Sequence, residues 1–299
     1  QIRRQASRGA DQHTCGRGNL LNMPTDLKIT HPDYDDTAVV RKKSRDLYEG
    51  NDVVKTVGNR ERYLYKEKNE SDDDYELRVK RAALDPWVEK IINARQALLF
   101  AKPITRELPE RLAEFEDDVD NRGNNADVFF QEVARESQID GIRWVLVDMP
   151  RLPEGGFASL AAENEAGHRP FFQQIPAANV IDWAVGADGK LLWAVVYEAE
   201  TEDRSDTWGD AADTTDRWKV WTRQEWIVYE EKTGEDGAKK GDFTEANRQP
   251  HGLEVVPLIP FFGTRRTGFS GWPVARTVLD HILQIFNKES DLDWFERFS

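Results

Sequence analysis

The chain has 299 residues, of which 39% are hydrophobic and 32% are charged, and its formal net charge is −14. This length allows one large or two ordinary domains, and the low hydrophobic share indicates a large surface that meets solvent or other subunits. The acidic balance argues against a protein built to grip phosphates, because affinity for DNA comes chiefly from Lys and Arg.

Residues 1–25 differ in composition from the rest, with arginines among Gly, Ser, Gln and Asn. We expect a flexible basic arm, either a disordered tail without a partner or a tail that docks on a neighbouring subunit or on DNA. The candidate DNA contacts are Arg3, Arg4, Arg8 and Arg17. Cys15 is the single cysteine, which excludes an intrachain disulfide and fits a reducing cytoplasm. Since no apolar run approaches the roughly 20 residues of a membrane span, no membrane partner is expected.

Residues 26–140 are predicted to be helical. The first helix is expected to begin at a capping Thr30, with Pro32 in its first turn, and to stop at Gly50. Ser71, which three aspartates follow, predicts the cap of a second helix with carboxylates at the positive end of its dipole.

A third helix is predicted from Asp85-Pro86, as cap and first position, to the residues before Lys102-Pro103. Its apolar residues form one stripe, which consists of Trp87, Val88, Ile91, Ile92, Leu98 and Leu99. A short helix after Pro109 and a helix that Asn125 caps and Gly141 ends complete this part.

Residues 141–265 are predicted to be a β-rich part. The strands expected from their alternation and their turn residues are 142–147, 180–185, 191–197, 218–221 and 226–229. Asp188-Gly189 suits a tight hairpin turn, and a second turn is expected at Arg223-Gln224. The acidic segments 200–216 and 230–242 are expected to be solvated loops.

Tryptophans concentrate in this β-rich part. Burial in the core or at a subunit interface is favoured over an exposed row that binds sugar rings or stacks on bases. The residues concerned are Trp183, Trp193, Trp218, Trp221 and Trp226.

Residues 266–299 are predicted to start a long amphipathic helix. From Pro273 onward one face carries Val274, Val278, Ile282, Ile285 and Phe286. The helix is either an ordinary core helix or one that needs a partner beyond this domain. Because aromatic residues continue to the last positions without a Gly, Asn or Pro stop, we expect an unfinished helix and a partial chain.

Motifs of catalysis are missing from the sequence. Residues 268–272 resemble a nucleophile elbow, but the motif requires Gly where Trp272 stands. There is no phosphate-binding Gly loop and no His-Glu-x-x-His, and the five histidines are isolated, as surface or capping residues would be. The sequence predicts no enzyme, no cofactor and no metal site.

The order of these parts resembles the portal proteins of tailed bacteriophages, the head-to-tail connectors. In that family a His-Pro-x-Tyr helix precedes a Tyr-Leu segment, an acidic Ser-Asp-x-x-Tyr helix, and a long helix that ends in Lys-Pro. The matching residues are His31-Pro32-Asp33-Tyr34, Tyr63-Leu64, Ser71 to Tyr75 and Ala101-Lys102-Pro103. The resemblance extends to about Asn287, and portal chains normally continue past this point.

The resemblance implies an α+β fold, with a helical wing part at 26–140, a twisted antiparallel β-rich wing part at 141–265, and the start of a stem helix at 266–299. It implies a structural subunit of a homo-oligomeric ring, a dodecamer, that forms the channel for DNA packaging and ejection at one capsid vertex. The partners would be capsid protein, terminase, a tail adaptor and nonspecifically passing double-stranded DNA, in the virion and, during assembly, in the host cytoplasm.

Two apolar helices supply the candidate subunit interface. Its residues are Trp87, Ile91, Val278, Ile282, Ile285 and Phe286. The alternative function is a carbohydrate-binding β module that uses the tryptophans of the β-rich part.

Overall fold

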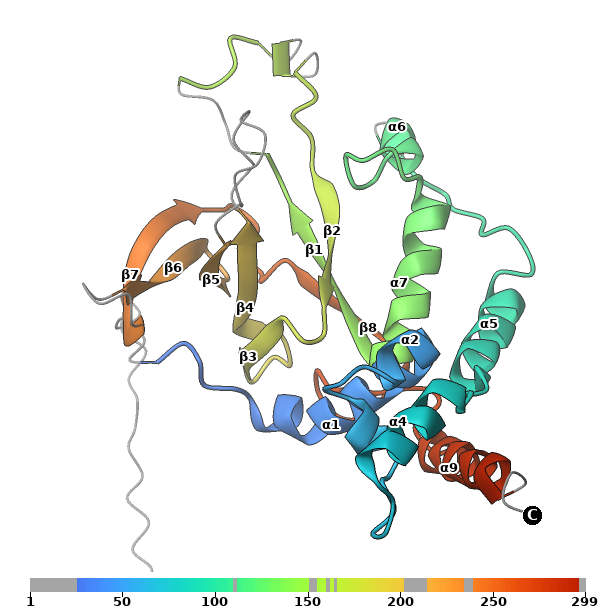
Figure 1. The fold of residues 1–299 in the computed structure, drawn as a ribbon. Coiled ribbons are helices and arrows are strands. Elements are labelled where there is room, and N and C mark those ends of the chain that lie inside the picture. The colour runs from blue at the N-terminus through green and yellow to red at the C-terminus, as the bar shows by residue number, and fades with distance from the viewer. Residues whose placement is uncertain are drawn as a thin grey trace, which may run out of the picture.

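The computed structural model describes residues 26–109, 112–150, 155–159, 162–163, 166–201, 214–233 and 239–295. The predicted basic arm, residues 1–25, lies outside these ranges. The described residues form an α+β fold, which confirms the predicted class: helices lie at the N-terminal and C-terminal ends, and antiparallel sheets lie between them (Figure 1).

The helices of the described residues are α1 (Pro32–Glu49), α2 (Asn51–Val54), α3 (Arg60–Tyr63), α4 (Asp72–Arg81), α5 (Trp87–Leu99), α6 (Ala113–Asp117), α7 (Ala126–Asp140) and α9 (Leu279–Phe295). The strands are β1 (Ile142–Asp148), β2 (Phe171–Pro176), β3 (Val180–Val185), β4 (Leu191–Thr201), β5 (Thr214–Thr222), β6 (Glu225–Thr233), β7 (Lys239–Pro250), β8 (Leu258–Phe262), β9 (Thr264–Arg265) and β10 (Gly271–Trp272).

Helix α1 begins one residue later than predicted. His31 is its cap and accepts a hydrogen bond from the Asp33 N–H at Nδ1 (3.1 Å), whereas Thr30 donates its hydroxyl to the Asp35 carboxylate (2.8 Å). Since Pro32 occupies the first helical position, where its missing N–H costs nothing, the cap falls on the residue before it. Gly50, with φ 79°, ends the helix as predicted.

The caps predicted for two other helices are confirmed. Ser71 Oγ accepts a hydrogen bond from the Asp74 N–H at the start of α4, and Asn125 Oδ1 accepts one from the Val128 N–H at the start of α7. Helix α5 starts at Trp87 with Pro86 as its cap, one residue beyond the predicted Asp85. These caps fix where each helix leaves the preceding loop.

The helical body has one core, to which both ends of the chain contribute. Leu47 and Tyr63 from the N-terminal helices pack in the same cluster as Leu279, Leu283 and Phe286 of α9. Helix α9 begins at Leu279, later than the predicted Pro273, because residues 274–278 form turns. The predicted stem role of residues 266–299 stays a prediction.

Arg78 on α4 forms a buried ion pair with Glu70, just before α4, and also donates a hydrogen bond to α9. Arg78, 3% exposed, donates from Nε and Nη2 to the two carboxylate oxygens of Glu70 (2.8 Å each), and its Nη1 reaches Ser290 Oγ (3.4 Å). Planar bidentate pairing of this kind fixes geometry as well as charge. The last described helix is therefore held by a specific contact in addition to its apolar face.

Two antiparallel sheets form the β-rich part. One has the strand order β2-β1-β8, and the other has the order β3-β4-β5-β6-β7; β9 and β10 form a small separate pair. Both predicted hairpins are confirmed, β3 with β4 and β5 with β6. Helix α7 covers one face of β1, where Phe129 and Val133 pack on Val145.

The prediction of solvated loops at 200–216 and 230–242 is wrong in the described residues. Strand β4 continues to Thr201, β6 continues to Thr233, and residues 239–242 already belong to β7. These strand ends are polar, so the sequence gives no strand signal there. They are strands because the pairing of β6 with β7 continues beyond the apolar part of the sheet, as between Glu230 and Thr244. Residues 202–213 lie outside the described residues.

Candidate functional site

The inner face of the five-stranded sheet changes from apolar to polar at one level across three strands. The inward residues, from core to rim, are Ala194, Val196 and Glu198 on β4; Trp221, Lys219 and Arg217 on β5; and Trp226, Val228 and Glu230 on β6. Because every second residue of a strand faces the same side, the apolar halves pack into the core between the sheets and the polar halves are left beside an opening.

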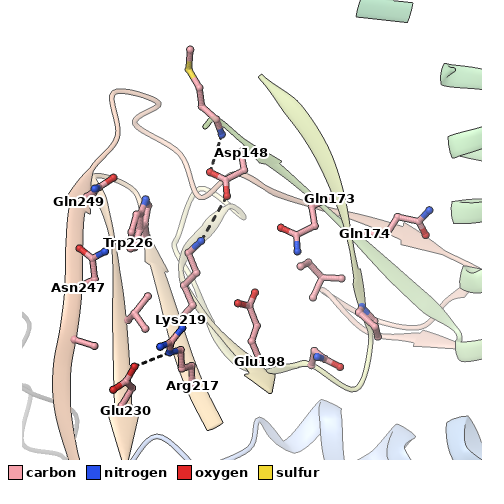
Figure 2. Close-up of a pocket in the computed structure, with 16 residues that line it drawn as sticks. Asp148, Gln173, Gln174, Glu198, Arg217, Lys219, Trp226, Glu230, Asn247 and Gln249 are labelled. Carbon is pink, nitrogen blue, oxygen red and sulfur yellow. Dashed lines mark hydrogen bonds and ion pairs between the residues drawn. The ribbon is translucent and has the colours of Figure 1, made fainter. Parts of the chain in front are cut away.

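The opposite wall of this opening follows the same pattern. On β1 and β2 the residues Trp144, Leu146 and Ile175 belong to the core, while Asp148 and Gln173 lie toward the rim. The two sheets thus pack together at one end and enclose a groove of about 870 Å³ at the other, which we call the inter-sheet groove (Figure 2).

Lys219 marks the boundary between the core and the groove. Its Nζ lies above the rings of Trp221 and Trp226, 4.4 and 4.7 Å from their centroids, and 3.7 Å from Asp148 Oδ2. The ammonium group therefore lies over both indoles and also faces the carboxylate on the opposite wall. Beside it, Arg217 Nε donates to Glu230 Oε1 at 2.7 Å. Both of these cations in the groove are therefore paired.

Glu198 is the carboxylate of the groove that lacks such a pair. Figure 2 shows its side chain directed into the groove between β5 and Gln173, and among the described residues no hydrogen bond or ion pair holds it. Burial raises the pKa of Glu198; the charges of Lys219 and Arg217 act in the opposite direction. A half-buried carboxylate without a partner favours a ligand that brings a positive charge or a hydrogen-bond donor.

Amide side chains complete the lining. Gln173 on β2 and Asn247 and Gln249 on β7 make no side-chain hydrogen bond within the described residues. By contrast, Asn179 donates to the Tyr197 carbonyl (2.9 Å) and Gln174 donates to Glu132 (3.0 Å). The first three amides are therefore available to a ligand. This groove was not predicted from the sequence, whose one signal for it is the placing of Glu198, Lys219 and Glu230 at alternate positions in otherwise apolar strands.

The candidate interface residues divide into two groups. Ile282 and Phe286 are 6% and 1% exposed, inside the core of the helical body, so their assignment to a subunit interface is corrected. Val278 is half-buried against that core and stays a candidate. The sequence pattern shows an apolar face but not which surface covers it. Ile285 is 44% exposed and Ile91 is half-buried, and both remain open to a partner.

Helix α5 exposes part of its predicted apolar stripe. Val88 and Ile92 are buried, but Trp87 is 44%, Leu99 58% and Leu98 80% exposed. The segment after α5, which runs from α5 to α6 along the outside of the molecule (Figure 1), is exposed as well. We call the residues Trp87, Leu98, Leu99, Ile104, Leu108 and Leu112 the apolar strip; each is at least 39% exposed.

Charged contacts fix the middle of this strip to the molecule. Arg106 pairs with Glu116 at 2.8 Å and with Asp127 at 2.7 Å. The apolar residues on either side of Arg106 are therefore presented outward on an anchored segment. Exposed apolar patches are typical of surfaces that meet another protein.

The tryptophans of the β-rich part are mostly core residues, as predicted. Trp183, Trp218, Trp221 and Trp226 are buried, and Trp193 packs partly buried against the outer cluster of the five-stranded sheet. The row of exposed indoles that a carbohydrate-binding module requires is therefore not present in these strands.

Ser270, the centre of the elbow-like segment, is buried, and its Oγ has no hydrogen-bond partner within the part of the chain that the structure describes. Within the described ranges no group of three His, Cys, Asp or Glu is arranged to hold a metal ion, and none of the helices there has the length and apolar character of a membrane span. Arg3, Arg4, Arg8 and Arg17 lie outside the described residues. No protein-family model and no curated protein matches this chain.

Proposed function

We propose that the protein is a structural, non-enzymatic subunit of a bacteriophage portal ring. The ring conducts DNA into and out of the capsid at one vertex and docks the terminase motor and later the tail. The body of the protein is acidic, which repels the duplex and keeps it sliding.

The exposed apolar strip is the observation that carries this proposal. A monomer gains nothing from exposing Leu98 and Leu99 at the end of α5, whereas a neighbouring subunit in a ring would bury them. At roughly 1.5–3 kcal/mol for each large apolar side chain removed from water, the strip contributes substantially to association.

The order of the helices supports the same proposal. The His-Pro-x-Tyr residues form the start of α1, with His31 as cap. Tyr63 and Leu64 lie in the core of the helical body, and Ser71 caps α4. Helix α5 ends just before Lys102-Pro103. The short motifs of the resemblance are thus the starts and ends of consecutive elements.

The test is the mass of the full-length protein in solution. Light scattering should give a mass many times that of one chain, and electron microscopy should show rings. The double variant Leu98→Glu/Leu99→Glu should lower the mass and keep the fold, because both side chains are exposed. Leu253→Glu, at a position 51% exposed in the connection between β7 and β8, is the matched control. A stable wild-type monomer at high concentration would refute the proposal.

A further inference from the structure

Among the described residues of the inter-sheet groove, the one charge without an ion-pair partner is the negative charge of Glu198. Lys219 forms an ion pair with Asp148, and Arg217 forms one with Glu230. The groups that can still bind a ligand are the carboxylate of Glu198 and the amides of Gln173, Asn247 and Gln249. A carboxylate beside amide oxygens suits a guanidinium group, which has five N–H donors in a planar fork and no acceptor. A phosphate would instead need free cations, and a sugar ring would need an exposed aromatic face, so both fit less well.

The start of the described chain lies close to this opening. Lys28 Nζ donates to Glu231 Oε1 at 2.7 Å, and Leu27 packs on the outer face of the five-stranded sheet. Glu231 follows Glu230 on β6, and neighbouring residues of a strand face opposite sides of the sheet. The chain that precedes residue 26 therefore joins the body at the level of the groove rim, and 25 fully extended residues reach roughly 80 Å.

From these observations we propose that the inter-sheet groove binds the arginine-bearing N-terminal segment of this protein, residues 1–25, with Glu198 as counter-ion of an arginine. The segment carries four arginines and one aspartate, against a whole-chain net charge of −14. The inference does not depend on ring formation, because every group that it uses belongs to the β-rich part and the N-terminal segment.

Affinity is measured on the full chain. In the variant Arg3→Gln/Arg4→Gln/Arg8→Gln/Arg17→Gln the protein's own segment no longer competes, and a labelled peptide of residues 1–25 should bind it. Adding Glu198→Gln should weaken binding about tenfold, which corresponds to roughly 1.4 kcal/mol. A peptide with the four arginines replaced by Gln should not bind. Glu289→Gln, an exposed carboxylate on α9, is the control of equal charge change and should leave binding unaltered.

Location is measured separately with the single thiol of the chain. A photo-crosslinker on Cys15 of the otherwise native protein should attach to peptides that contain Gln173, Glu198 or Asn247, and Glu198→Gln should reduce these products. Circular dichroism confirms that the variant is folded. The proposal is wrong if the products map to the helical body, if Glu198→Gln leaves the affinity unchanged, or if Glu289→Gln weakens binding equally.

Discussion

The imidazole of His31 stacks on the indole of Trp183, with ring centroids 4.1 Å apart and planes inclined by 15°. The same histidine caps α1 through Nδ1, and its backbone N–H donates to the carbonyl of Ile181 on β3 (2.9 Å). One side chain thus joins the first helix to the five-stranded sheet. A capping role was expected for histidines of this chain; the stacking was not.

Replacing His31 with Ala should therefore destabilise the protein by about 1–3 kcal/mol, since both the cap and the stacked ring are removed. His31→Asn keeps a capping side chain without the ring and should recover about 1 kcal/mol of that loss. Urea unfolding of the three proteins measures the difference. Equal stability of His31→Ala and the wild type would show that the cap and the stacking of His31 on Trp183 contribute nothing to stability.

Asp182, next to Trp183, makes the stability of the protein depend on pH. Burial raises the pKa of its carboxyl above the value in the unfolded chain, although the Trp183 N–H and His31 act in the opposite direction. A raised acid pKa means that folding favours the protonated form, so this group costs stability as the pH rises from about 4, the unfolded value. Asp182→Asn should stabilise the protein at pH 7 and change it little at pH 3.5. Thermal unfolding of the wild type and the variant at both pH values measures this difference. A variant less stable than the wild type at pH 7 would contradict the prediction.

The buried Arg78–Glu70 pair should contribute far more to the stability of the fold than an exposed ion pair does. Arg78→Met leaves a buried Glu70 carboxylate without its partner, which typically costs about 3–5 kcal/mol. Lys66→Met breaks the exposed pair with Asp72 and should change the free energy of unfolding far less, because solvent screens that pair. Denaturant titrations compare the two. Hydrogen exchange should also show α9 opening in Arg78→Met, and equal small losses for both variants would mean that α9 is held by other interactions.

Phe286 and Ile285 separate the core of the helical body from its surface. Phe286→Ala should cost about 3–5 kcal/mol at any protein concentration, because the ring is buried within one chain. Ile285→Ala, at an exposed position, should change the free energy of unfolding by less than about 0.5 kcal/mol in a monomer. A loss for Phe286→Ala that disappears on dilution would restore its assignment to a subunit interface.

Binding of duplex DNA should be weak, nonspecific and due to the N-terminal arginines. The variant with Arg3, Arg4, Arg8 and Arg17 replaced by Gln should bind less tightly, and the slope of log affinity against log salt should fall by about 0.9 for each phosphate that the variant no longer neutralises. Anisotropy of a labelled duplex across a salt series measures this. Tight binding that is insensitive to salt in this variant would place the DNA-binding surface on the acidic body instead.

Local signals predicted much of this fold. Gly50, Ser71, Asn125 and Gly141 mark helix ends through interactions with neighbours in sequence, and Asp188-Gly189 closes its hairpin for the same reason. Long-range pairing was not predictable in the same way. Strand β7 is stabilised by β6 along its length, and its own polar sequence carries little β signal.

The groove and the apolar strip show the same limit. The inter-sheet groove depends on register, which places Lys219 opposite Val228 and Arg217 opposite Glu230. The stripes on α5 and α9 look alike in sequence, yet Phe286 is buried and Leu98 is exposed. An amphipathic pattern shows that a face is apolar; which partner covers it is set by the tertiary fold.

The shared core of the first and last helices has a consequence for synthesis. Strands β3 to β7 pair with their neighbours in chain order, so this meander needs only local closures and is expected to form while the ribosome still holds the C-terminal part. Leu47 and Tyr63, in contrast, can complete their core only after Phe286 has been synthesised, more than 200 residues later in the chain. Until α9 emerges, the N-terminal helices expose an apolar surface that a chaperone or a neighbouring nascent chain can bind.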